Sequence, residues 1–310
     1  MAGKGRVEYA VVDAFTESPF GGNPAAVVLW LGGADADAWM QSVAKEFNLS
    51  ETAFVSPEDA PSSSGEPGRR FRLRWFTPVA EVDLCGHATL ASAHFLFSSG
   101  LVSGDKIEFL TRSGLLTANK VGLGRTNDLM EGKFAVQLDF PMAALEDCDP
   151  SDFSSITAAL NGATVTNIKK ASTDDLLAIF LLKLYFCSFC VVYIEVASEN
   201  MLQNLQPQLN VLKNFPGRGI IVTAAASPSS DVDFISRFFC PRLGIDEDPV
   251  TGSAHCALAP YWSKKLGKHD FTAYQASPRG GKLILQLKED LGRVLIQGEA
   301  ISIMAGSIRV

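Results

Sequence analysis

The chain has 310 residues, of which 47% are hydrophobic and 20% are charged, and its formal net charge is −7. This composition excludes a disordered chain and predicts a globular protein with one large domain or two medium ones. The sequence contains no basic run, so we expect neither nucleic acid nor an anionic membrane as a partner. The first residues show no apolar signal-peptide core, which predicts a cytoplasmic protein.

In the first part of the chain, alternating or β-branched residues predict strands at 6–15, 25–31, 52–56, 70–77, 106–111 and 115–120. Apolar residues with helical spacing predict a helix over 39–47 that begins at Asp35 or Asp37 and stops at Asn48. Glu51 therefore lies at a helix-to-strand junction. The polar stretches 57–69 and 122–132 are expected to be loops, and the second of them is the best candidate for a domain boundary.

In the second part, the same patterns predict strands at 133–140, 218–224, 233–239, 281–287, 293–297 and 300–308. Residues 151–160 are expected to form a helix that ends at Asn161-Gly162, and residues 199–213 a helix interrupted at Pro207. The segment 178–198 is unusually apolar, yet Lys183 interrupts it, so it is too short and broken to span a membrane.

Two segments of the chain resemble each other. Leu84–Thr89 precedes a small-residue helix predicted from about His87 to Ser98, and Pro249–His255 precedes one predicted from about Ser253 to Leu266. Gly86 and Gly252 are 166 positions apart, and the glycines that follow the two helices, Gly100 and Gly267, are 167 apart. The recurring offset predicts two similar halves, each a curved sheet around one small-residue helix.

The starts of these two helices are candidate anion-binding sites. The first turn of a helix leaves backbone N–H groups unpaired and carries positive partial charge, which suits a carboxylate. One such helix start alone is usually only a cap. The duplication and the polar residues around both starts favour a functional interpretation.

Four side chains near these helix starts are candidates for chemistry. Glu51 has mainly apolar neighbours in the sequence, and burial would make its carboxylate easier to protonate, as a general acid/base requires; the alternative is a solvated junction residue. His87 can donate a hydrogen bond to a ligand or act only as a cap. Asp248 and Ser253 precede or begin the second helix, so each is either a binding residue or a helix-entry residue.

The six cysteines do not form a disulfide framework. Cys187 and Cys190 form one close pair without a nearby histidine, so buried thiols are favoured over a zinc site. Cys85 precedes Gly86, where a thiol can act as a base or nucleophile. Its expected counterpart is the pair Pro249-Val250, which argues against a racemase that uses two thiols. His94 and His255 are expected to be structural and His269 to lie on the surface.

The motifs together resemble those of the phenazine-biosynthesis PhzF-like family, which shares its fold with diaminopimelate epimerase. The resemblance covers nearly the whole chain and rests on Val12–Phe15, Gly22–Ala25, Asn48–Glu51, Phe76–Pro78, Cys85–His87, Asp139–Pro141 and Glu247–Ala254. Gln275 with Arg279-Gly280-Gly281 resembles the eukaryotic branch of the family.

The resemblance implies an α+β fold of two pseudo-symmetric domains, each a barrel-like, mostly antiparallel sheet around a central helix. It implies domains at residues 1–128, joined by a C-terminal strand at 300–310, and 129–299, with the active site in the cleft between them. A homodimer is plausible from the family.

The resemblance also implies an isomerase that moves a proton between carbons of a small carboxylate-bearing metabolite in a biosynthetic process, with no metal or organic cofactor. The phenazine enzyme isomerises trans-2,3-dihydro-3-hydroxyanthranilate and uses the motif glutamate that matches Glu51 as acid/base. His87, Asp248 and Ser253 match family residues that help hold the substrate. The remaining substrate-binding candidates are Asn23, Ser50, Gly86 and Gly252.

Two departures from the family pattern leave alternatives open. Of the paired cysteines that the related epimerases use, this chain keeps only the first, Cys85, which favours one-base isomerisation over an epimerase or racemase that uses Cys85 with Glu51. The segment 178–198 has no recognisable counterpart in the family. If it distorts the second domain, the protein is a carboxylate-binding protein without turnover.

Overall fold

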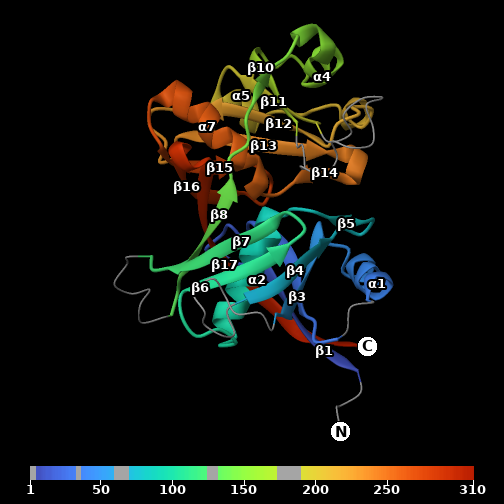
Figure 1. The fold of residues 1–310 in the computed structure, drawn as a ribbon. Helices are drawn as coiled ribbons and strands as arrows, with labels where there is room; N and C mark the ends of the chain where they lie inside the picture. Colours follow the sequence, from blue (N-terminus) through green and yellow to red (C-terminus); the bar gives the residue numbers. More distant parts are fainter. Residues whose placement is uncertain (1–4, 33–35, 59–69, 124–131, 173–189) are drawn as a thin grey trace. The chain divides into compact units, whose positions relative to one another are not determined.

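The computed structural model describes residues 5–32, 36–58, 70–123, 132–172 and 190–310 (Figure 1). They form two compact units, Met1–Phe140 with Leu295–Val310, and Pro141–Val294. The domain boundary expected at residues 128–129 lies outside the described residues. So do the apolar run at 180–187 and most of the loops expected at 57–69 and 122–132.

Within its described residues, the first unit contains eight long strands, one two-residue strand and two helices. In chain order they are β1 (Arg6–Ala14), β2 (Asn23–Leu29), α1 (Asp37–Phe47), β3 (Glu51–Pro57), β4 (Arg70–Phe76), β5 (Glu81–Val82), α2 (Gly86–Ser98), β6 (Lys106–Thr111), β7 (Gly114–Val121), β8 (Ala135–Pro141) and most of β17 (Arg293–Arg309).

The strands of this unit close into a barrel. β1 pairs antiparallel with β2 and with β17, from Arg6 opposite Arg309 to Ala14 opposite Ala300. The β2–β3 and β4–β6 pairs are parallel, while β3–β4, β6–β7 and β7–β8 are antiparallel. β8 also pairs with β17, and this last pairing completes the ring.

The two helices lie on opposite faces of this barrel wall. α2 is apolar around its whole circumference, and Gly86–Ala93 are all buried, as expected of a small-residue helix enclosed by strands. α1 is amphipathic and packs Met40, Val43 and Ala44 on the outer face of β2, β3 and β4. Both faces of these strands are therefore covered, which explains why β2 and β3 are apolar rather than alternating.

The second unit repeats the topology. Its elements are β9 (Glu146–Asp147), α4 (Ser154–Ala159), β10 (Val165–Ser172), β11 (Cys190–Val196), α5 (Glu199–Gln203), α6 (Leu209–Leu212), β12 (Gly219–Ala225), β13 (Phe234–Cys240), β14 (Ile245–Asp248), α7 (His255–Leu266), β15 (Asp270–Gln275), β16 (Gly281–Lys288) and the start of β17. Four short 3₁₀ helices accompany them in the part of this unit that the structure describes: Pro150–Phe153, Pro241–Leu243, Gly252–Ala254 and Glu289–Leu291.

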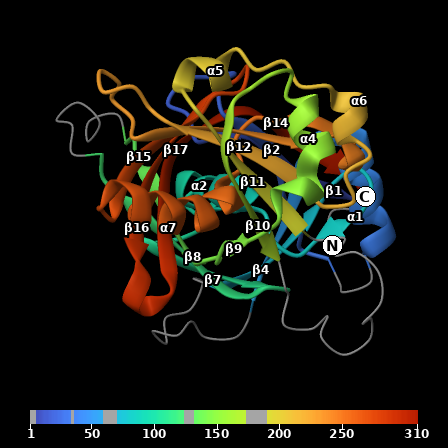
Figure 2. The same cartoon turned by 90° about the horizontal axis from the view of Figure 1, so that it is seen from above.

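Strand pairing in the second unit follows the order of the first. β11–β12 and β13–β15 are parallel, and β10–β11, β12–β13 and β15–β16 are antiparallel. α7 lies beside β16 (Figure 2) and buries seven residues, among them Trp262. α4, α5 and α6 cover a separate apolar cluster formed by residues such as Ile194, Val222 and Ile235.

Several sequence expectations need correction. Asp37 is the first residue of α1 rather than its cap, which is Ala36, because its carboxylate is engaged with Arg74 at 2.7 Å. The two C-terminal strands are one, β17, since Gly298 continues the strand where it passes Phe15 and Leu90. The helix expected at 151–160 begins as a 3₁₀ turn capped by Asp149.

Other expectations are confirmed. The predicted strand positions all fall on observed strands, although β5, β9, β10, β11, β14 and β15 were not predicted. Asn48 and Gly267 end α1 and α7 in the left-handed conformation. The fold is α+β, built from two units of matching topology with a helix packed against each sheet. No helix in the described part of the chain is long and apolar enough to span a membrane.

Candidate active site

The turn between β1 and β2 places Asn23. Asp13, at the end of β1, is fully buried, and its Oδ2 accepts the Phe20 backbone N–H at 2.7 Å, which holds the turn in shape. Gly22 adopts a positive φ of 59°, and a Cβ there would lie 2.1 Å from the Ala14 carbonyl oxygen, so only glycine fits. Asn23 follows as the first, fully buried residue of β2.

The end of α1 places Ser50 and Glu51. Asn48 turns the chain out of the helix, and β3 then starts at Glu51, opposite Ala25 of β2. Side chains alternate along a strand, so Glu51 points away from the face on which Phe54 contacts α1. Its side chain is 14% exposed. The helix-to-strand junction predicted for Glu51 is confirmed.

The start of α2, which we call the α2 tip (Cys85–Thr89), carries the next two groups. Cys85 is the extended N-cap residue, and Gly86 and His87 form the first turn. The Thr89 hydroxyl donates to the Cys85 carbonyl at 2.5 Å. Both Cys85 and His87 are buried. The predicted helix start at His87 is therefore correct to within one residue.

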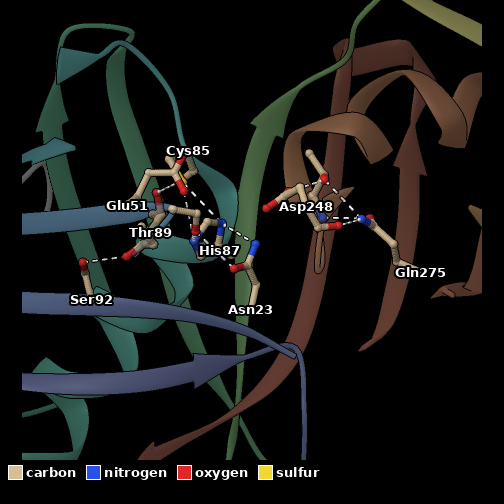
Figure 3. A network of polar contacts seen from close by, with 11 residues as sticks. Asn23, Glu51, Cys85, His87, Thr89, Ser92, Asp248 and Gln275 are labelled. Carbon is tan, nitrogen blue, oxygen red and sulfur yellow. Dashed lines mark hydrogen bonds and ion pairs between the residues drawn. The ribbon is translucent and has the colours of Figure 1, made fainter. Parts of the chain in front are cut away.

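These groups meet around the imidazole of His87 (Figure 3). Nδ1 lies 3.1 Å from Asn23 Nδ2, and Nε2 lies 3.3 Å from both Ser50 Oγ and Glu51 Oε2. The Ser50 hydroxyl donates to Asn23 Oδ1 at 3.3 Å, which turns the amide nitrogen toward His87. Because that nitrogen only donates, Nδ1 accepts and the ring proton is on Nε2, directed at Glu51 and Ser50.

Cys85 adds a thiol to this group. Its Sγ lies 3.5 Å from His87 Nδ1. One ligand atom each from Glu51, Cys85 and His87 lie within 4.8 Å of one another, so among the described residues these three side chains can share a metal ion. The first-unit residues predicted from the sequence, Asn23, Ser50, Glu51, Gly86 and His87, are thus adjacent.

The second predicted group surrounds Thr251 at the α7 tip (Thr251–His255). The Thr251 hydroxyl donates to the buried carboxylate of Asp248. Gln275 is fully buried, and its side-chain amide accepts the Thr251 N–H at 2.7 Å and donates to the Asp248 carbonyl at 2.7 Å. Figure 3 shows Gln275 reaching the Asp248 segment. Asp248 is therefore held in a fixed position rather than solvated as a simple helix-entry acid.

His255 completes this arrangement. Its Nδ1 lies 2.9 Å from the Thr251 carbonyl oxygen and donates to it. The ring stacks near Phe234, and complete burial lowers the pKa of His255 to about 4. The sequence expectation that His255 is structural agrees with this environment. Burial likewise lowers the pKa of His94 to about 4, and His269 is exposed as expected.

Gly252 and Ser253 lie in a 3₁₀ turn, Gly252–Ala254, which leads into α7. Thr251 is the N-cap residue of this turn and Ala254 is that of α7, so the alternative in which Ser253 is the cap is wrong. Thr251 also occupies the place that Cys85 has at the α2 tip, rather than Pro249-Val250. The nearby thiol of Cys256 is buried, and burial raises its pKa to about 12, which disfavours the reactive thiolate form.

The position equivalent to Glu51 in the second unit is Gly219. Thr52, next to Glu51, pairs with Phe76; in the second unit Ile220, next to Gly219, pairs with Phe239. A Cβ at Gly219 would lie 2.4 Å from the ring of Phe238. The second unit therefore has no carboxylate here and no space for one.

The contacts made by Thr251, Thr89 and Gln275 were not predicted from the sequence. Thr89 follows Cys85 by four residues, a spacing at which a hydroxyl can bond back to a carbonyl in a helix, so this contact had a local signal. Gln275 lies 24 residues beyond Thr251, and no local pattern links the two.

The fold and the two polar groups define a protein of the PhzF and diaminopimelate-epimerase-like class. The family described as phenazine biosynthesis-like protein (PhzC-PhzF) matches residues 12–306. The chain belongs to this family.

Individual relatives agree over their full lengths. A protein of Halalkalibacterium halodurans named as an uncharacterised isomerase is 43% identical over 300 residues, 96% of this chain and 97% of that protein. The human phenazine biosynthesis-like domain-containing protein is 38% identical over 305 residues, again 96% and 97% of the two chains. The crystal structure of a PhzF-family phenazine biosynthesis protein from Enterococcus faecalis superposes with a TM-score of 0.75 at 36% identity, covering 98% of this chain and 100% of that one.

Proposed function

We propose that this protein is an isomerase that moves a proton between two carbons of a small, carboxylate-bearing metabolite, with Glu51 as the general acid/base. The observation that carries the proposal is the Glu51 carboxylate, 14% exposed and 3.3 Å from a histidine whose ring is held on its other side by Asn23. Two bacterial relatives, 43% and 40% identical, carry the name isomerase, which supports the reaction class.

In this proposal the surroundings of Glu51 set its position. The His87 Nε2–H donates to the carboxylate or to Ser50, and Asn23 and Ser50 fix the imidazole ring. A fixed carboxylate removes a proton from one carbon and returns it to another without reorganising, which is the geometric requirement of general acid/base catalysis. The negative charge that develops on the substrate is stabilised by backbone N–H groups of helix starts.

We assign catalytic roles to Glu51, His87 and Asp248. Substrate binding is assigned to six residues: Asn23, Ser50, Gly86, His87, Gly252 and Ser253. Glycine at positions 86 and 252 exposes the backbone N–H groups of the first turn to a carboxylate. The proposal requires no metal or organic cofactor, and it includes a cytoplasmic location and a homodimer, as expected from the sequence.

The competing function is an epimerase or racemase in which Cys85 and Glu51 are the two bases. It is favoured by one contact, the 3.5 Å separation between Cys85 Sγ and His87 Nδ1, which would stabilise a thiolate if the imidazole were protonated. The one-base proposal predicts that alkylation of Cys85 slows turnover only by blocking access, whereas replacement by serine is tolerated.

The proposal is tested by proton exchange in D₂O. A pool of small amino and hydroxy acids, including dihydro-hydroxyanthranilate, is incubated with wild-type protein, Glu51→Gln and Cys85→Ser, and deuterium at carbon is followed by NMR. We expect one compound to exchange with wild type, Glu51→Gln to lower the rate by at least about 100-fold, and Cys85→Ser to retain most of it.

The matched control is Glu46→Gln, an exposed carboxylate on α1, which should leave the rate unchanged. Loss of exchange in each of the two single variants, Cys85→Ser and Glu51→Gln, would establish the two-base epimerase. Exchange retained in Glu51→Gln would remove Glu51 from the mechanism. Compounds that bind without exchange in any variant would identify a carboxylate-binding protein without turnover.

A further inference from the structure

We propose that Glu51, Cys85 and His87 form a Zn²⁺ site, and that occupation of this site by zinc inhibits the enzyme. The inhibition rests on the proposed function, because the metal would engage the carboxylate assigned as the acid/base. The site itself rests only on the three side chains and their geometry.

The first argument is the donor set. A thiolate, an imidazole and a carboxylate from one small region are the ligands that zinc takes in proteins, and three protein ligands leave the fourth position for water or a substrate carboxylate. The sulfur and nitrogen donors favour Zn²⁺ or Co²⁺ over Mg²⁺ and Ca²⁺, which prefer oxygen. A thiolate and a carboxylate together neutralise the charge of a divalent cation.

The second argument is distance. Zinc bonds of about 2.0–2.3 Å in a tetrahedral arrangement hold the ligand atoms about 3.3–3.8 Å apart. Glu51 Oε2 lies 3.3 Å from His87 Nε2, Cys85 Sγ lies 3.5 Å from His87 Nδ1, and one ligand atom from each residue falls within 4.8 Å of the others. The 3.3 Å and 3.5 Å separations involve opposite nitrogens of the ring, of which only one can bind the ion. With a single ring nitrogen the limit of 4.8 Å applies, so the ligand atoms must approach one another by up to about 1 Å to surround an ion.

The third argument is support from neighbouring groups. A metal-bound histidine usually donates its other ring N–H to a carbonyl or carboxylate oxygen, which orients the ring. If zinc binds Nε2, Nδ1 carries the proton, and rotation of the Asn23 amide presents Oδ1 to it in place of Nδ2. Cys85 and His87 are both at least nine-tenths buried, so little ordering is left to occur when the ion binds. On binding, the thiol proton leaves to solvent as the sulfur–zinc bond forms.

The experiment uses the full-length protein after dialysis against a chelator. Co²⁺ is titrated as a spectroscopic probe, and Zn²⁺ affinity is measured by competition with a chromophoric chelator. We expect one ion per chain and a thiolate-to-cobalt charge-transfer band that Zn²⁺ abolishes and Mg²⁺ does not. Cys85→Ser should remove the band, and His87→Gln and Glu51→Gln should each weaken binding by at least about tenfold.

Two controls address the other thiols. Cys148→Ser removes a partly buried free thiol elsewhere in the chain and should change nothing. The double variant Cys187→Ser/Cys190→Ser tests the close cysteine pair in the sequence. A band that persists in Cys85→Ser, or that is lost in the double variant, would overturn the proposal, as would the absence of stoichiometric Co²⁺ and Zn²⁺ binding by wild type.

A protection measurement covers the case in which Cys85→Ser does not fold. Wild-type protein is alkylated with and without Zn²⁺, and the modified peptides are identified by mass spectrometry. Selective protection of Cys85 supports the site, and equal alkylation overturns it. A measurement of proton exchange by the metal-free protein, in the presence of a chelator, separates the two proposals. If the protein binds Co²⁺ but catalyses no exchange when metal-free, the proposed function fails and the metal site stands.

Discussion

The α2 tip and the α7 tip share a backbone device but differ in chemistry. In each, the side chain four residues after the N-cap donates to the N-cap carbonyl: Thr89 to Cys85, and His255 to Thr251. Both pairs are separated by the same offset of 166 positions. In both tips, a side-chain hydrogen bond to a backbone carbonyl fixes the first turn, although the residue types that form this bond differ.

The side chains around the two tips have separate tasks. Around α2, Asn23, Ser50 and Glu51 converge on His87, next to the thiol of Cys85. Around α7, Gln275 and Asp248 hold Thr251, and no hydrogen bond links the Ser253 hydroxyl to the described residues. Under the proposed function, the α2 tip supplies the acid/base and the groups that position it, and the α7 tip supplies Asp248 in a rigidly held position.

The difference extends to the strand ends. Gln275, at the end of β15, has Thr111 of β6 as its counterpart by strand register. Thr111 bonds within its own tight turn, to the Gly114 carbonyl at 2.8 Å, whereas Gln275 is followed by a longer connection to Gly281 and reaches Thr251. In the second unit, the longer loop therefore occurs together with a side-chain contact from the strand end to the helix tip, whereas Thr111 in the first unit bonds within its own turn.

The largest expected effect is on this support. Gln275→Ala removes the side-chain acceptor of the Thr251 N–H and a donor to the Asp248 carbonyl from a fully buried position, which should lower the free energy of unfolding by about 3 kcal/mol. Denaturant unfolding measures the change. Gln286→Ala removes a partly exposed glutamine from the next strand and should cost less than about 0.5 kcal/mol; equal losses would mean that Gln275 has no special supporting role.

The next effect tests the reactive group at the α2 tip. Glu51→Asp retains the carboxylate but withdraws it by one methylene from His87 and the substrate. We expect kcat/KM for proton transfer to fall about 100-fold, equivalent to about 2.7 kcal/mol, with stability little changed. An aspartate variant as active as wild type would show that the position of this carboxylate is not critical.

A third change addresses the equivalent position in the second unit. Gly219→Ala places a Cβ against the Phe238 ring, and relief of this overlap should cost about 2 kcal/mol of unfolding free energy. Gly122→Ala is the matched control, since a Cβ there meets nothing within 4 Å. A neutral Gly219→Ala would mean that the second unit has room for a side chain where the first carries Glu51.

The smallest effect concerns the pH dependence of the α7 tip. The pKa of His255 is about 4 when folded and near 6.5 when unfolded, so the unfolded chain takes up more protons between these values and stability falls as pH falls through this window. His255 should account for a loss of about 1 kcal/mol between pH 6.5 and pH 5.5.

This contribution is isolated with His255→Asn, whose amide can still donate to the Thr251 carbonyl. Unfolding free energies are measured for both proteins at the two pH values, above the range in which most carboxylates titrate. The variant should lose about 1 kcal/mol less than wild type over this interval. Parallel pH profiles would exclude His255 as a source of the dependence.

The sequence predicted features that local chemistry determines. The ends of α1, α2 and α7 follow from Asn48, Gly100 and Gly267, and the offset between the two glycines at the helix starts predicted the repeated topology. The group around His87 was predicted only because the family motifs bring Asn23, Glu51 and Cys85 together, since these residues are distant in the sequence.

The features that were missed depend on tertiary contacts. β11 and β15 each pair with a parallel neighbour, and such pairing has no local hairpin signal. Asp37 has the residue type and position of a cap, but the ion pair with Arg74 of β4 holds its carboxylate elsewhere. Gln275 became recognisable as a support for Thr251 only once β15 was placed beside β13.

The glycine at position 219 has a stereochemical consequence under the proposed function. A racemase inverts a carbon by taking the proton from one face and delivering it to the other, which needs two groups. Gly219 means that the second unit supplies no carboxylate at the position equivalent to Glu51, and in the one-base proposal Cys85 is not a base, so Glu51 alone moves the proton. The proton then leaves and returns on the same face of the substrate. If the substrate carries deuterium at the reacting carbon, part of that deuterium is retained in the product rather than exchanged with solvent.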